Sequence, residues 1–147
     1  RRAREGSDWL YLPSVRDLAA WADFLVVATP GGAATRHLVD GGVLDALGPD
    51  GFLVNIPRGS VVDTHALIAA LRQGRLAGAA LDVVEGEPDI PPELLELDDI
   101  VLTPHIAGSL GLECRRMGRL MAEELDRYLK GLPLEHEVDL KRFQSMA

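Results

Sequence analysis

Four places in the sequence carry residues whose types suit chemistry, and each lies within a few residues after an apolar run: Thr29-Pro30, Arg58, Glu87 and His105. An arginine guanidinium binds a planar carboxylate through two parallel hydrogen bonds. Histidine exchanges a proton near neutral pH, and a neighbouring carboxylate can orient its ring. Because the carboxyl ends of parallel strands meet at one edge of a sheet, where ligands bind, these residues indicate a site at that edge.

The apolar runs before these residues predict the strands of a parallel sheet. They are short, continuous and rich in apolar or β-branched residues, which is typical of strands buried on both faces. One helix is predicted before the first run, at about 14–21, and two between later runs, at about 43–47 and 63–73. This alternation predicts βαβ units with right-handed connections, and therefore an α/β fold. The predicted strands are residues 24–28, 52–56, 79–84 and 100–102.

The pattern changes after Gly108. Residues 111–130 predict one long amphipathic helix, which Gly131 and Pro133 should end. Its apolar stripe consists of Met117, Leu120, Met121, Leu125 and Leu129.

Composition excludes several classes of protein. The 147 residues, 47% of them apolar, predict a globular chain with a hydrophobic core rather than a disordered one. The net charge of −8 argues against non-specific nucleic-acid binding. No apolar run approaches the roughly 20 residues that a membrane span needs. Cys114 is the only cysteine and the start at Arg1 lacks a signal-like apolar stretch, so a cytoplasmic location is expected.

Three blocks of sequence resemble the D-2-hydroxyacid dehydrogenase family. NIPRGSVVD at 55–63 is similar to the signature that holds the family's substrate-binding arginine. GRLAGAALDV at 74–83 continues it through EGEP at 85–88, and LTPHIAGS at 102–109 completes it. The segment TPGGAATRHL at 29–38 resembles the glyoxylate/hydroxypyruvate reductase branch in particular.

The resemblance implies roles for the three chemically distinctive side chains. Arg58 would bind the substrate carboxylate and keto oxygen, and His105 would be the general acid or base. Glu87 would pair with His105, orient the ring and favour its charged form. Glu85 is the neighbouring acid, but the family's carboxylate stands immediately before the proline, which selects Glu87.

The resemblance also implies a nicotinamide cofactor, NAD(P), and no metal. Thr29, Pro30 and the backbone at Ile56 would line the cofactor, and Asp82 would contact its carboxamide. Gly108 would allow close approach of the backbone. The implied fold is a Rossmann-like, doubly wound parallel sheet.

No G-x-G-x-x-G loop, which would hold the cofactor pyrophosphate, occurs in the 147 residues. In the family this loop lies upstream, on the first strand of the cofactor domain. Residues 1–107 are therefore expected to be the carboxyl-terminal part of that domain. Residues 108–147 are expected to return to the substrate domain. The 147 residues alone are expected to be inactive.

Cofactor preference is expected to depend on Arg1 and Arg2, which fall where the family's second strand should end. Arginine at that position accommodates the 2′-phosphate of NADP, whereas an acid would bind the ribose hydroxyls of NAD. No acid precedes Glu5. NADPH is therefore expected to be favoured over NADH.

The expected function is reduction of a small 2-keto acid, such as glyoxylate or hydroxypyruvate, by a homodimer. The individual acid stays open. The alternatives are a cofactor-binding regulatory protein of the corepressor type on the same scaffold, and an inactive fragment that self-associates. A formate dehydrogenase of this family is expected to carry glutamine where Glu87 stands.

Overall fold

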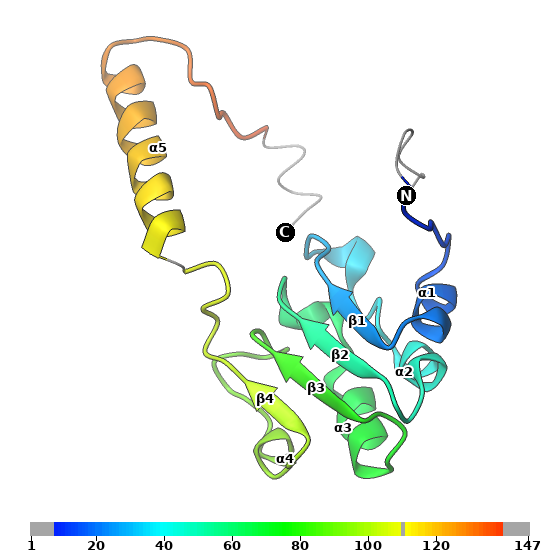
Figure 1. The fold of residues 1–147 in the computed structure, drawn as a ribbon. Helices are drawn as coiled ribbons and strands as arrows, with labels where there is room; N and C mark the ends of the chain where they lie inside the picture. The colour runs from blue at the N-terminus through cyan, green and yellow to red at the C-terminus, as the bar shows by residue number, and fades with distance from the viewer. Residues whose placement is uncertain (1–7, 110, 140–147) are drawn as a thin grey trace.

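The computed structural model describes residues 8–109 and 111–139 and contains a four-stranded sheet in the order β1-β2-β3-β4. Every neighbouring pair of strands is parallel, as predicted (Figure 1). The first three strands end one to three residues earlier than expected. The strands are β1 (Phe24–Val27), β2 (Phe52–Asn55), β3 (Gly78–Leu81) and β4 (Ile100–Leu102).

Short helices precede and connect the strands, and the first three α-helices each begin at a side-chain cap. Ser14 Oγ accepts a hydrogen bond from the Asp17 backbone N–H at 3.0 Å, at the start of the first helix. Asp40 and Asp63 cap the next two in the same way, each accepting from the backbone N–H three residues on. The elements are α1 (Val15–Trp21), η1 (Ala33–Thr35), α2 (Gly41–Leu47), η2 (Gly59–Val61), α3 (Thr64–Arg72) and α4 (Pro92–Leu95).

The hydrophobic core lies between one face of the sheet and the helices. Alternate residues of β1 and β2, such as Leu25 and Leu53, point into it, as the period of two in a strand requires. The helices contribute their apolar stripes. The core residues from the helices include Ala19, Val43, Leu44, Leu47, Leu67, Ile68, Leu71 and Leu94.

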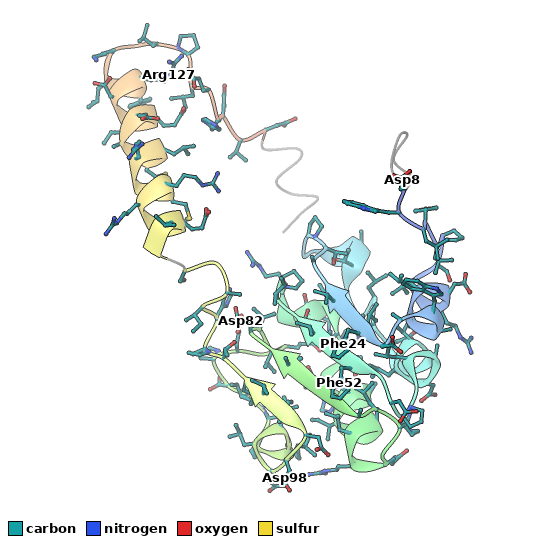
Figure 2. The ribbon with its side chains drawn as sticks, in the orientation of Figure 1. Asp8, Phe24, Phe52, Asp82, Asp98 and Arg127 are labelled. Atoms are coloured by element: carbon teal, nitrogen blue, oxygen red, sulfur yellow. The ribbon has the colours of Figure 1, made fainter. Side chains whose placement is uncertain are left out.

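The opposite face of the sheet is open, so the prediction that the strands are buried on both faces is wrong for the described chain. Phe24 and Val26 are 65% and 57% exposed. Phe24 stacks on Phe52 with ring centroids 5.1 Å apart, and both lie on this open face (Figure 2). A continuous apolar run indicates a strand, but burial on its second face requires a second layer, which the described residues do not supply.

The long helix α5 (Gly111–Leu129) ends one residue before the predicted end and extends away from the sheet (Figure 1). Most of its apolar stripe, including Met117, Met121 and Leu125, is exposed. After Gly131 the chain folds back, and Arg127 donates to the Pro133 carbonyl at 2.8 Å. Within the described residues, no helix has the length and apolar character to span a membrane.

Candidate active site

A histidine and a carboxylate meet beyond the carboxyl ends of β3 and β4. His105 Nδ1 lies 2.9 Å from Glu87 Oε1, and both side chains are partly exposed. With an ionised Glu87 as the acceptor, Nδ1 carries a proton, and Nε2 is the ring atom through which a ligand could receive or lose one. The structure therefore brings together the two residues that the sequence pairs.

The neighbouring acid Glu85 makes different contacts. Its Oε2 lies 2.9 Å from His37 Nε2, and its Oε1 lies 2.7 Å from the Arg36 guanidinium. Glu85 and Glu87 thus face different histidines although they are two residues apart. The geometry agrees with the choice of Glu87 as the partner of His105.

Asp82, directly after β3, holds the loop that carries His105. Its Oδ1 accepts hydrogen bonds from Thr103 Oγ1 at 2.6 Å and from the Ile106 N–H at 2.9 Å, and its Oδ2 accepts from the Ala107 N–H at 2.9 Å. Its backbone carbonyl accepts from the His105 N–H at 3.0 Å. Figure 2 shows Asp82 at this end of the sheet, with Asp98 at the other.

This supporting role of Asp82 was missed by the sequence analysis, which assigned it only a cofactor contact. The available signal was an acid directly after a buried strand, since a buried carboxylate needs hydrogen-bond donors. The support matters because His105 has a φ of +53°, a left-handed conformation that is uncommon outside glycine.

Hydrogen bonding decides the ionisation of Asp82. Burial raises the pKa of its carboxyl, but hydrogen bonds from Thr103, Ala107 and Ile106 and the charge of His105 lower it. The net result is a pKa below the ordinary value of 3.8. The carboxylate is therefore ionised at neutral pH.

We expect Asp82→Asn to destabilise the protein by about 1–3 kcal/mol at pH 7, because an amide N–H₂ would face backbone donors. Since the folded-state pKa is lowered, the ionised carboxylate stabilises the fold above pH 3.8, and this contribution is lost as pH falls through the lower, folded-state value. Urea unfolding of the full-length wild type and variant at pH 7 and near pH 3 measures the difference. A destabilisation of equal size at both pH values would contradict this account.

Arg58 lies on the turn after β2, at the same edge of the sheet, and its side chain is exposed. Its guanidinium donates to the Pro57 carbonyl at 2.7 Å, and its own carbonyl accepts from Asn55 Nδ2 at 3.2 Å. A Cβ on Gly31 would lie 2.5 Å from Arg58 Cγ, so glycine there makes room for the arginine stem. None of these contacts joins Arg58 to His105 or Glu87.

The residues expected to line the cofactor differ from one another in burial and in hydrogen bonding. Thr29 Oγ1 and Asn55 Oδ1, after β1 and at the end of β2, are the buried side-chain oxygens within residues 8–109 and 111–139 that have no hydrogen-bond partner. Unsatisfied buried oxygens at the ligand-binding edge suit a polar ligand. Asn55 was not among the residues expected to contact the cofactor.

The other expected cofactor residues are exposed or lie outside the described chain. Pro30 and Ile56 are exposed at the carboxyl edge. A Cβ on Gly108 would meet nothing within 4 Å, so no contact within the described residues requires glycine there. Arg1 and Arg2 lie outside the described residues.

A cavity of about 440 Å³ opens beside the His105–Glu87 pair. Asp82 and Thr103 supply further polar groups to its wall. Its apolar lining consists of Val84, Pro88, Ile90, Leu102 and Pro104. Apolar walls with a few convergent polar groups are typical of small-molecule sites.

Comparison with known proteins gives consistent matches. Residues 2–107 match the family model for the NAD binding domain of D-isomer specific 2-hydroxyacid dehydrogenases. The chain is 50% identical over 125 residues to glyoxylate/hydroxypyruvate reductase A HPR2 of Arabidopsis thaliana, covering 84% of this chain and 40% of that protein. It is 44% identical to hydroxyphenylpyruvate reductase of Plectranthus scutellarioides, covering 91% of this chain and 43% of that protein.

Among solved structures, an NADPH-dependent glyoxylate/hydroxypyruvate reductase from Sinorhizobium meliloti, in complex with NADP and malonate, superimposes with a TM-score of 0.89 at 37% identity. The match covers 99% of this chain and 45% of that one. A 2-hydroxyacid dehydrogenase from Ketogulonicigenium vulgare Y25 gives a TM-score of 0.87 at 42% identity, covering 95% and 44%. The chain thus spans about two fifths of the length of the curated relatives that it matches.

Proposed function

Because this chain belongs to the D-isomer specific 2-hydroxyacid dehydrogenase family, we propose that its protein transfers a hydride between NAD(P)H and a small 2-keto or 2-hydroxy acid. Glyoxylate and hydroxypyruvate are the proposed substrates. The single observation that carries the proposal is the 2.9 Å contact between His105 and Glu87 at the carboxyl edge of the sheet. A polarised histidine at that edge is suited to acid–base chemistry on a bound acid.

Three side chains have proposed roles in the reaction, each following from the chemistry of the side chain. In reduction, His105 Nε2 gives a proton to the keto oxygen, and in oxidation it takes a proton from the hydroxyl. Glu87 accepts from Nδ1–H, which fixes the orientation of the ring. Arg58 binds the substrate carboxylate and orients the keto oxygen.

The residues at the carboxyl edge fit a nicotinamide cofactor, which supplies the hydride when bound. Thr29 Oγ1 and Asn55 Oδ1 are buried there without partners in the described chain, so each has hydrogen-bonding capacity for a polar ligand group. Asp82 Oδ2 accepts only one of the hydrogen bonds described above, so it can also accept one from a carboxamide. Pro57 has no backbone N–H to donate to the cofactor. Pro30 and the backbone at Ile56 would line the cofactor without a hydrogen bond from residue 57.

We expect the full-length protein to prefer NADPH to NADH, because Arg1 and Arg2 would face the 2′-phosphate. The ratio of kcat/KM for the two cofactors, measured before and after Arg1→Ala and Arg2→Ala, tests this. The substitutions should shift the ratio toward NADH. A strong NADH preference in the unaltered protein would refute the assignment.

The proposal extends to organisation and location. Residues 1–107 would form the carboxyl-terminal part of the cofactor domain, and 108–147 would belong to the substrate domain, which the end of the family match at residue 107 supports. The open sheet face and the exposed stripe of α5 support contacts with further protein surface, including a second copy in a homodimer. A single cysteine supports a reducing compartment such as the cytoplasm.

Turnover by the full-length protein tests the function. NADPH and NADH oxidation are followed with glyoxylate, hydroxypyruvate and a larger 2-keto acid, and the 147-residue chain serves as a comparison that should not turn over because it lacks the phosphate-binding loop. Saturable reduction by the full-length protein supports the proposal. Tight cofactor binding without turnover of any 2-keto acid would favour the regulatory alternative instead.

A further inference from the structure

A second histidine–carboxylate cluster ties together the loops that follow the first three strands. Glu85, from the loop after β3, contacts His37 Nε2 at 2.9 Å and the Arg36 guanidinium at 2.7 Å, both from the loop after β1. His37 Nδ1 also lies 3.9 Å from Asp63 Oδ2, which follows β2. The Glu85 and His37 side chains are partly buried, at 24% and 34% exposed.

His37 is joined directly to the turn that carries Arg58. Its backbone N–H donates to the Ser60 carbonyl at 2.8 Å, two residues after Arg58. Its φ is +49°, so the residue is held in an uncommon left-handed conformation at this junction. A parallel bridge between Val39 and Val62 extends the same contact.

The Arg58 turn also packs against the backbone of Glu85 itself. A Cβ on Gly59 would lie 2.1 Å from the Val84 carbonyl carbon and 2.3 Å from the Glu85 nitrogen. The two loops therefore touch through backbone at a position where a larger residue does not fit. From the other side, the Arg58 stem fills the space left by Gly31.

The position of the Arg58 guanidinium depends on this turn. The side chain is exposed, and its guanidinium donates to the carbonyl of the adjacent Pro57. Two-point binding of a carboxylate requires the guanidinium to be held within roughly 0.5 Å of its productive place by surrounding groups. Within the described residues, the backbone of the turn supplies that constraint, since the Pro57 carbonyl that the guanidinium contacts is part of it.

We propose that Glu85 is a positioning residue for Arg58, acting by clamping Arg36 and His37 against the turn that carries it. This inference rests on the proposed function, since it assigns Arg58 to the substrate carboxylate. Removing the charge of Glu85 loosens the clamp and lets the guanidinium move. Loss of the Glu85 charge should therefore weaken binding of the acid. Proton transfer by His105 should be unchanged, because Glu85 does not contact His105.

The test compares Glu85→Gln with wild type in the full-length protein. We expect the KM for glyoxylate and the Kd for oxamate, a 2-keto acid analogue that cannot accept a hydride, to rise about five- to tenfold, with kcat changed less than about twofold. Glu96→Gln is the control, because it removes a carboxylate from an exposed pair with Arg72 at 3.0 Å, away from the site. It should leave all three constants unchanged.

The Arg58→Ala background separates positioning from general stability. If Glu85 acts through Arg58, then Glu85→Gln should change kcat/KM by less than about twofold in that background. His37→Asn tests the same clamp by another route, since asparagine tolerates a positive φ but is too short to replace the ring. It should weaken oxamate binding in the same way, even if Glu85→Gln does not fold.

The proposal is overturned if the folded variants bind oxamate as tightly as the wild type does. It is also overturned if Glu85→Gln lowers kcat/KM by the same factor in the Arg58→Ala background as in the wild type. Failure of the proposed function looks different. In that case wild-type protein reduces no 2-keto acid, whereas a loss of oxamate binding in Glu85→Gln would still uphold the positioning role.

Discussion

His105→Asn is expected to lower kcat for both glyoxylate reduction and the reverse oxidation by about 10²- to 10⁴-fold, the usual contribution of a general acid or base. Asparagine is the suitable replacement because His105 has a φ of +53°, which asparagine tolerates better than alanine. The change therefore removes the proton donor with little added backbone strain. Steady-state kinetics in both directions on the full-length protein measure the loss.

The matched control is His65→Asn. His65 is an exposed histidine in the first turn of α3 that does not line the cavity beside His105 and Glu87, and its replacement should change kcat less than about twofold. If His105→Asn keeps more than about half of the wild-type kcat, the proton comes from another group.

Glu87→Gln extends the same prediction to the partner of His105. Glutamine can still accept a hydrogen bond from Nδ1, but the negative charge 2.9 Å from the ring is lost. Because that charge holds Nδ1–H and orients the ring, kcat for reduction should fall by about three- to tenfold. A kcat equal to that of the wild type would mean that Glu87 does not act on His105.

Arg58→Ala is expected to raise the KM for glyoxylate by on the order of 10²-fold, because it removes two charge-assisted hydrogen bonds to the substrate carboxylate. Arg58→Lys keeps the positive charge but not the planar guanidinium, so its KM for glyoxylate should rise about tenfold. KM and kcat for both variants, with the Kd for oxamate, distinguish lost binding from lost chemistry.

Arg72→Ala is the control for this series. Arg72 is an exposed arginine at the end of α3, and its partner is Glu96. Its removal should leave KM unchanged, since exposed ion pairs contribute little to stability and this one lies away from the site. An unchanged KM in Arg58→Ala would remove Arg58 from the substrate site.

The difference between Glu85 and Glu87 bears on any variant made in this loop. Each acid lies 2.9 Å from a histidine nitrogen. Glu87 contacts the proposed proton donor His105, whereas Glu85 clamps the loops that pack against the Arg58 turn. Substitution of either should reduce activity, but through different constants. Loss at Glu87 should appear in kcat, and loss at Glu85 should appear in the affinity for the acid.

Much of the fold could be predicted from the sequence because it depends on interactions between near neighbours. Ser14 and Asp63 cap helices by bonding to N–H groups three residues away, and the run at 100–102 forms a strand with the predicted bounds. The alternation of these elements then determines a parallel sheet. The motif around Arg58, Glu87 and His105 predicted the candidate site before any contact was known.

Tertiary structure decided what depends on residues far apart in the chain. The sequence of β1 does not reveal that Phe24 and Val26 face outward, because burial depends on which layers are present. The contacts of Asp82 with residues 103–107 and of Glu85 with His37 join positions more than 20 residues apart. Their donors and acceptors meet only after the parallel strands bring their carboxyl ends to one edge, so residue spacing alone could not assign them.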